Sequence, residues 1–153
     1  IMETEKEQII EKIKILSLQK RNAVFRIAAA NGLYPGQLPI LEYIIDNEGC
    51  TQKEIAKKMR VSPASIASST KRLQRSGLIQ KKVDEGNLRQ NMLFVTEKGR
   101  ELAENCRNEL SLFQDAFFDG FSEEELTRLS DILDHINRNI SQGAKYHSKS
   151  FNH

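Results

Sequence analysis

The chain has 153 residues, of which 39% are hydrophobic and 29% charged, and a net charge of +2, values typical of a globular domain with helical additions. No apolar run approaches the roughly 20 residues that a membrane-spanning helix needs, and the acidic N-terminal segment does not have the pattern of a signal peptide. Cys50 and Cys106 lie far apart without a CxxC or histidine-paired spacing, which predicts a reducing, cytoplasmic compartment and argues against a disulfide scaffold or a zinc site.

The first part of the chain predicts two helices. Residues 3–30 show one long helical pattern, with an apolar stripe formed by Ile9, Ile13, Leu16, Val24 and Ala28. The stretch NGLYPG then ends this helix, because Asn-Gly suits a helix C-terminus and Pro-Gly breaks helices. A second helix is predicted for residues 37–46, with apolar Leu38, Leu41, Ile44 and Ile45.

Two short helices follow with a very tight join at residues 60–61. Thr51 and Glu54 form a capping box for the first of them, whose buried side is predicted to be Ile55, Ala56 and Met59. Ser62 caps the second, and Pro63 occupies its first position, where the missing N–H costs nothing. Ile66, Thr70 and Leu73 are spaced to face the core, and Gly77 ends the helix.

The rest of the chain predicts a hairpin and two helices. Residues 78–83 and 92–96 are strand candidates, and residues 84–91 (DEGNLRQN) are the predicted hairpin loop. Thr96 caps a fifth helix, whose apolar positions are Leu102, Cys106, Leu110, Phe113, Phe117 and Phe121. Ser122 opens a last helix, whose apolar seam is Leu126, Leu129, Leu133, Ile136 and Ile140.

This order of elements predicts a mostly α-helical fold, a winged helix-turn-helix with a two-stranded wing, flanked by N- and C-terminal dimerisation helices. We predict a winged domain at residues 35–96, a helical dimerisation region at residues 1–34 and 97–142, and a flexible tail at residues 143–153. The seam of the last helix also suits packing within one chain. Dimerisation is favoured because the winged domain is too small to cover the apolar surface of both the first and last helices.

Charge and residue size both point to nucleic acid. Residues 51–92 carry a net charge of +7, whereas residues 1–50 and 93–153 carry −1 and −4. The helix that Ser62 opens is filled with small residues, which let its backbone approach base edges in a major groove about 12 Å wide. We expect base contacts from Pro63, Ala64, Ser65 and Ser68, and phosphate contacts from Lys53, Ser62, Lys71 and Arg72.

Arg89 lies near the predicted tip of the hairpin. A planar guanidinium on a thin loop suits the narrow minor groove of a duplex. The alternative is a surface ion pair between Arg89 and Asp84 or Glu85.

The same residues resemble those of MarR-type (multiple antibiotic resistance) transcriptional regulators. The similarity rests on TQKEIAKKMRVSPASIASSTKRLQRSGLIQKK and on NLRQNMLFVTEKGREL, in which Arg89, Thr96 and Gly99 follow the helix pair. It implies a homodimer, the helix 63–76 in the major groove, Arg89 in the minor groove, and a ligand pocket between the dimerisation helices and the winged domain. Two positions depart from the family, which usually has Asp where Asn87 stands and a large aliphatic residue where Ser69 stands.

Other functions have little support in the sequence. There is no phosphate-cradling glycine loop, nucleophile elbow or HExxH motif, so we expect neither an enzyme nor a metal or other cofactor. Cys50 and Cys106 are interpreted as inert structural thiols, and His135 as a surface or interface residue. We predict a cytoplasmic, homodimeric repressor that binds a pseudo-palindromic operator in double-stranded DNA and responds to a small molecule or stress signal. The alternative is a winged helix that binds protein.

Overall fold

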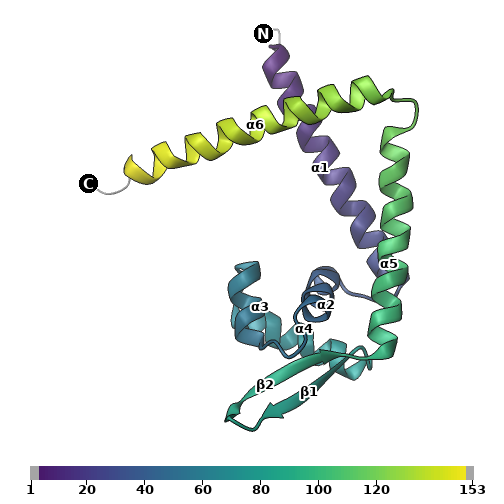
Figure 1. Ribbon diagram of the computed structural model, residues 1–153, viewed down its shortest axis with the longest axis vertical. Coiled ribbons are helices and arrows are strands. Elements are labelled where there is room, and N and C mark those ends of the chain that lie inside the picture. Colours follow the sequence, from purple (N-terminus) through teal and green to yellow (C-terminus); the bar gives the residue numbers. More distant parts are fainter. Residues whose placement is uncertain (1–3, 151–153) are drawn as a thin grey trace. The chain divides into compact units, whose positions relative to one another are not determined.

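The computed structural model describes the backbone of residues 4–150 and the side chains of residues 4–143. It is mostly helical with one two-stranded antiparallel sheet, which confirms the predicted fold class (Figure 1). Two compact units are formed, residues 1–111 and residues 112–153. The first holds α1 (Glu5–Ala30), α2 (Gln37–Asp46), α3 (Gln52–Met59), α4 (Pro63–Arg75), β1 (Ile79–Asp84), β2 (Asn87–Val95) and most of α5 (Glu97–Asp115).

The helix starts follow the predicted caps. The Thr51 hydroxyl accepts the Glu54 N–H while the Glu54 carboxylate accepts the Thr51 N–H, so the capping box is complete. Ser62 caps α4 with Pro63 in its first turn, and Ser122 and Glu125 form a second predicted box. Thr4, which the sequence analysis did not single out, forms another box at the start of α1.

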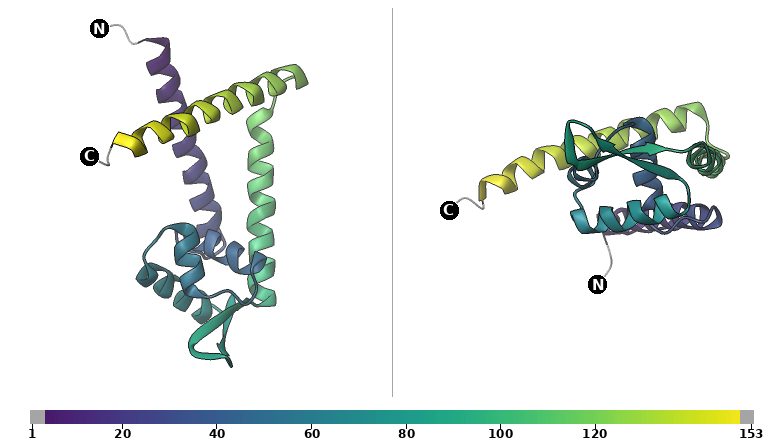
Figure 2. Two further views of the ribbon diagram at one scale, coloured as in Figure 1. Left: turned by 60° about the vertical axis from the view of Figure 1, so that its left-hand side comes forward. Right: turned by 90° about the horizontal axis from the view of Figure 1, so that it is seen from below.

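One hydrophobic core fixes the winged part of the first unit. Its fully buried side chains come from α2, α3, α4, both strands and α5, and the largest are Leu41, Ile44, Ile55, Ile66, Leu73, Ile79 and Leu93. Because every element of the helix-turn-helix and the wing contributes to this core, α4 and the hairpin are held in fixed positions within the unit. Seen from below, α4 and the hairpin lie next to each other (Figure 2).

The hairpin is longer than the sequence predicted. Ile79 pairs with Val95 and Val83 with Asn91, and only Glu85 and Gly86 form the turn, so residues 87–91 belong to β2 and not to a loop. The register shifts between Val83 and Asp84, because Asp84 pairs with Asn87. Residues 88–90 therefore have no cross-strand partner and bulge from the ladder. A separate bridge between Cys50 and Leu93 joins β2 to the start of α3.

The second unit holds a 3-10 turn and α6. The sequence predicted a fifth helix reaching Phe121, but α5 ends at Asp115, followed by η1 (Ala116–Phe118). The helix cannot continue because Asp119 is extended and Gly120 has a φ of +83°. α6 (Glu123–Ser150) is longer than expected, since its backbone is helical in residues 143–150, where a tail without regular structure was predicted. Residues 151–153 lie outside the described residues. None of the helices in the described part of the chain is long and apolar enough to span a membrane.

Candidate nucleic-acid interface

The two sides of α4 differ sharply in exposure. Ile66, Thr70 and Leu73 are at most 1% exposed, as their spacing predicted. All predicted contact residues on or beside this helix are exposed: Ser62, Pro63, Ala64, Ser65, Ser68, Lys71 and Arg72. Pro63, Ala64, Ser65 and Ser68 have small side chains, which leave the helix backbone accessible from outside.

Hydrogen bonds of the buried Thr70 and of the exposed cap residue Ser62 hold α4 in place. The buried Thr70 hydroxyl accepts the Gln52 side-chain amide at 2.9 Å and donates to the Ile66 carbonyl at 2.9 Å, which ties α4 to α3. At the N-terminus the Ser62 hydroxyl accepts the Ser65 N–H at 3.2 Å and donates to the Ser65 hydroxyl at 2.9 Å. The Ser65 hydroxyl proton is thus left for an acceptor outside the chain, while the Ser62 hydroxyl is engaged in capping.

A tyrosine that sequence reasoning missed supports Arg72. The guanidinium carbon lies 4.8 Å from the centre of the Tyr34 ring, a cation–π distance. Tyr34 is itself held in the α1–α2 connection, since its N–H donates at 3.0 Å to the side-chain oxygen of the buried Gln37. No local signal in the sequence reveals this contact, because the two residues are far apart in the chain.

The wing presents Arg89 from β2, within the bulge, and its side chain is exposed. Among the described residues its guanidinium forms no ion pair, so the alternative pairing with Asp84 or Glu85 is not observed. The Asp84 carboxylate instead accepts the Gly86 N–H at 2.9 Å. Asn87, where the family usually has Asp, accepts the backbone N–H of Arg89 at 3.2 Å, so it shapes the bulge from which the guanidinium projects.

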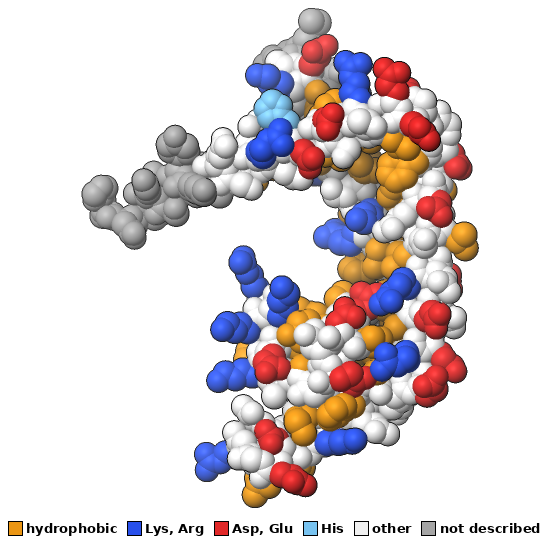
Figure 3. All heavy atoms as spheres, in the orientation of Figure 1, with side chains coloured by type: hydrophobic (Ala, Val, Ile, Leu, Met, Phe, Trp, Pro, Cys, Tyr) orange, Lys and Arg blue, Asp and Glu red, His pale blue; other side chains and the backbone are white. Residues whose placement is uncertain are grey.

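Three of the predicted residues from three different elements border one hollow of about 460 Å³. Lys53 comes from the first turn of α3, Pro63 from the start of α4 and Arg89 from β2; the remaining lining residues are Thr51, Gln52, Gln90 and Asn91. The cations Lys53 and Arg89 and the N-terminus of α3 therefore surround a space that has no acidic residue in its lining. Figure 3 shows Lys and Arg side chains gathered over α3 on the face that it draws.

Contacts at the base of the wing explain why Thr96 is followed three residues later by Gly99. The Thr96 hydroxyl donates to the Gly77 carbonyl at 2.6 Å and accepts the Gly99 N–H at 3.1 Å, which confirms Thr96 as the cap of α5. A Cβ on Gly99 would lie 2.9 Å from the Leu78 carbonyl carbon and still closer to its oxygen, so only glycine fits. Glu48, unforeseen from the sequence, adds a second anchor by pairing with Arg100 at 2.8 Å and accepting the Val95 N–H at 3.1 Å.

Both cysteines of the chain are buried and unpaired with each other. Burial raises the pKa of the Cys50 thiol to about 11 and also raises the pKa of Cys106, so both thiols stay protonated near neutral pH. No group of three His, Cys, Asp or Glu residues within the described ranges is placed to hold a metal ion, and His135 is exposed. Ser69 is half-buried on α4.

Comparison with known proteins agrees with this geometry. Residues 31–90 match the model of the MarR family. The chain is 32% identical over 114 residues to the uncharacterised HTH-type transcriptional regulator YybA of Bacillus subtilis, an alignment covering 74% of this chain and 76% of that protein. The structure is similar to a MarR family transcription regulator at 24% identity, covering 92% of this chain and 95% of the other, with a TM-score of 0.79. It is also similar to a mutant of S. aureus MepR bound to an oligodeoxyribonucleotide, at 19% identity, 86% and 97% coverage and a TM-score of 0.68.

Proposed function

Because the chain belongs to the MarR family of transcriptional regulators, we propose that it is a cytoplasmic, homodimeric repressor that binds an operator in double-stranded DNA and is released by a small molecule or stress signal. One observation carries the DNA-binding part of this proposal. The exposed side of α4 is made of small and basic residues, while its opposite side is fully buried in the core. Such a helix has the shape and charge needed to enter a major groove.

The proposed contacts divide between the grooves and the backbone. Pro63, Ala64, Ser65 and Ser68 face the base edges, and the free hydroxyl proton of Ser65 suits a base or phosphate acceptor. The cationic or polar residues at the rim, Lys53, Ser62, Lys71 and Arg72, hold phosphates. Arg89, exposed and without an ion pair in the described part of the chain, enters the minor groove. The MepR mutant, which has a similar fold, is bound to an oligodeoxyribonucleotide, and this supports DNA as the class of ligand.

Exposed apolar side chains support a homodimer. α1 exposes large hydrophobic residues at Ile9, Ile10, Ile13, Ile15, Leu16, Leu18 and Phe25, between 39% and 65% exposed. α6 exposes Ile132, Leu133 and Ile140, and the segment before it exposes Leu112, Phe118 and Phe121. Apolar faces of this extent are typical of interaction surfaces. A second copy of the chain is the proposed partner, because a two-fold dimer presents two copies of α4 to half-sites about 34–36 Å apart.

Release by a signal rests on the family relationship. The buried cysteines limit what that signal can be. Oxidant sensing needs an accessible thiolate with a low pKa, whereas the pKa of both Cys50 and Cys106 is raised by burial. A bound small molecule is therefore favoured over direct thiol oxidation.

The test uses the full chain and a pool of randomised duplexes. Sequences retained after repeated selection are labelled, and their affinity is measured by fluorescence anisotropy over a series of salt concentrations. Three phosphate-binding cations per protomer, Lys53, Lys71 and Arg72, give a slope of log K against log salt of about −5 for a dimer, at about −0.9 per phosphate. Enrichment of a pseudo-palindrome with such a slope supports the proposal. Failure to enrich any sequence, or a nearly flat salt response, rejects it in favour of a protein-binding winged helix.

A matched variant separates α4 from the rest of the surface. Ser65→Leu places a bulky side chain on the exposed side of α4; it removes the exposed hydroxyl bond from Ser62 but keeps the residue 65 N–H that Ser62 caps. We expect the dimer and the thermal unfolding to be unchanged and binding to the selected duplex to be lost. Normal binding by this variant would show that α4 does not enter the groove.

A further inference from the structure

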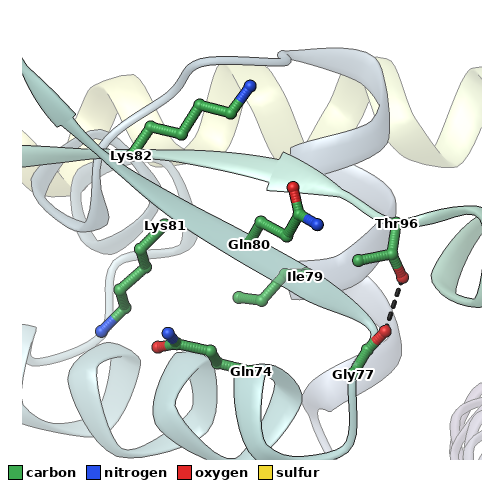
Figure 4. A pocket seen from close by; sticks show the side chains of 7 residues that line it. All are labelled: Gln74, Gly77, Ile79, Gln80, Lys81, Lys82 and Thr96. Carbon is green, nitrogen blue, oxygen red and sulfur yellow. Dashed lines mark hydrogen bonds between the residues drawn. The ribbon is translucent and has the colours of Figure 1, made fainter.

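A second hollow lies beside α4 and is not explained by the contacts above. It has a volume of about 520 Å³ and is lined by Gln74, Gly77, Ile79, Gln80, Lys81, Lys82 and Thr96. We call it the α4–β1 groove, because its walls are the last turn of α4 and the first half of β1 (Figure 4). Its lining contains two lysines and no acidic residue.

The two lysines point in opposite directions. Alternate side chains of a strand face opposite sides, so Lys81 shares the side of the buried Ile79, and Lys82 shares the side of the exposed Gln80. Figure 4 shows Lys81 pointing toward Gln74 of α4, with Lys82 pointing away from that helix. The Lys82 ammonium lies 4.8 Å from the centre of the Phe94 ring, so it already has a partner within the chain.

Lys81 has no such partner. It is half-buried, and in the part of the chain that the structure describes its ammonium forms no ion pair with a carboxylate. A partly desolvated ammonium is stabilised by an anion with several oxygen acceptors. The neighbouring Gln74 side chain adds two further N–H donors on the α4 side of the groove.

The position of the groove identifies the anion. Gln74 lies three residues after Lys71 on α4, so the two side chains are neighbours on the helix surface. In the proposed complex α4 lies in the major groove and the wing reaches the minor groove. The sugar-phosphate strand that separates the two grooves of a duplex must then pass between α4 and the hairpin.

We propose that Lys81 and Gln74 bind a backbone phosphate of this strand, in the α4–β1 groove. This inference rests on the proposed function and adds a phosphate site that links the α4 contacts to the wing contacts. It assigns Lys81 to positioning the duplex, and not to sequence recognition, because phosphates carry no sequence information.

The test compares two neighbouring lysines with the same change of charge. Lys81→Gln and Lys82→Gln are made in the full chain, with Lys81→Arg as the variant that keeps the charge. Binding is measured by anisotropy against the selected duplex and a scrambled duplex over a series of salt concentrations, and folding is checked by thermal unfolding. Loss of one phosphate contact in each protomer makes the salt slope shallower by about two units for the dimer.

We expect Lys81→Gln to weaken binding to both duplexes by a similar factor, about tenfold at moderate salt, with the shallower slope. Lys82→Gln should change the slope by less than half as much, and Lys81→Arg should restore it. Equal slopes for the two glutamine variants would overturn the phosphate site while leaving the proposed function intact. If the wild-type chain itself shows no salt-dependent binding, the proposed function fails, and the site fails with it.

Discussion

Gly99→Ala offers the sharpest test of how the wing is attached. Gly99 lies in the first turn of α5, buried against the backbone of Leu78. A Cβ at this position would lie 2.9 Å from the Leu78 carbonyl carbon and 3.0 Å from a Val95 methyl group, and closer still to the Leu78 oxygen. Backbone atoms cannot rotate away as a side chain can, so the start of α5 must shift from the start of β1.

The size of the effect follows from what this shift breaks. The contact region holds three hydrogen bonds: Thr96 hydroxyl to Gly77 carbonyl at 2.6 Å, Thr96 N–H to Leu78 carbonyl at 3.0 Å, and Gly99 N–H to Thr96 hydroxyl at 3.1 Å. Losing two of them costs about 2 kcal/mol, and the strain of an added methyl group in a packed site costs about 1–3 kcal/mol. The free energy of unfolding should fall by about 3–5 kcal/mol.

Gly143→Ala is the matched control, because Gly143 lies in α6 and a Cβ there would meet nothing within 4 Å. Alanine is the better helix former, so this variant should be stabilised by up to about 1 kcal/mol. Both free energies are measured by urea unfolding at one protein concentration, because a dimer's stability depends on concentration. A Gly99→Ala variant as stable as the wild type would refute the idea that this contact holds the wing base in place.

The other predictions concern the DNA contacts and the buried thiol. Arg89→Ala should weaken binding to the selected duplex by about 1–3 kcal/mol, the scale of one good groove contact; an unchanged anisotropy titration would place Arg89 outside the interface. Tyr34→Leu removes the ring beneath Arg72 and should weaken binding about two- to fivefold, from a cation–π energy of about 0.5–1 kcal/mol at an exposed site, whereas Tyr34→Phe should bind nearly as the wild type does; equal losses in both variants would contradict this. Burial raises the pKa of the Cys50 thiol from 9.0 to about 11 in the folded chain. The folded state therefore holds the thiol proton more tightly than the unfolded state does. The protonated thiol's contribution to the free energy of unfolding is fully present below pH 9 and is lost as the pH rises toward 11. Urea unfolding across this range should therefore show a steeper fall for the wild type than for Cys50→Ala, and parallel curves would refute the shift.

The helix-turn-helix was predictable from local signals. Ser62 and Pro63 mark the start of α4, because Ser62 is its cap and Pro63 its first residue. The spacing of Ile66, Thr70 and Leu73 marks its buried side. These signals depend on neighbours within one or two helical turns, so the sequence alone carries them. The exposure of the candidate contact residues follows directly, because the remaining side of a helix with one buried stripe faces outward.

The wing and the contacts around it were less predictable, because they depend on residues that are distant in the chain. Asn87 to Asn91 have turn-like composition, and they belong to β2 because Asn87 pairs with Asp84 and Asn91 with Val83 across the hairpin, on either side of the bulge. Glu48 contacts Val95 and Arg100, which are 47 and 52 residues away. A carboxylate in the turn after α2 gives no sign of such partners. The end of α5 at Asp115 was also missed, since the apolar spacing continues through Phe121 although the helix does not.

The residues that position the candidate interface are different from those that form it. The spacing between α4 and the hairpin is set by Leu73, Leu78, Ile79 and Leu93, which are at most 3% exposed and cannot touch a duplex. On and beside the exposed side of α4, the Ser62 hydroxyl caps the helix and Arg72 contacts the Tyr34 ring, whereas Ala64 and Ser68 have no side-chain hydrogen bond in the described residues. Substitutions at Ala64 or Ser68 should therefore alter the preferred operator with little effect on the free energy of unfolding. A change in the core that moves the hairpin should reduce binding to all sequences alike. It would change the spacing between α4 and the hairpin, which must match the spacing between the two grooves of the duplex.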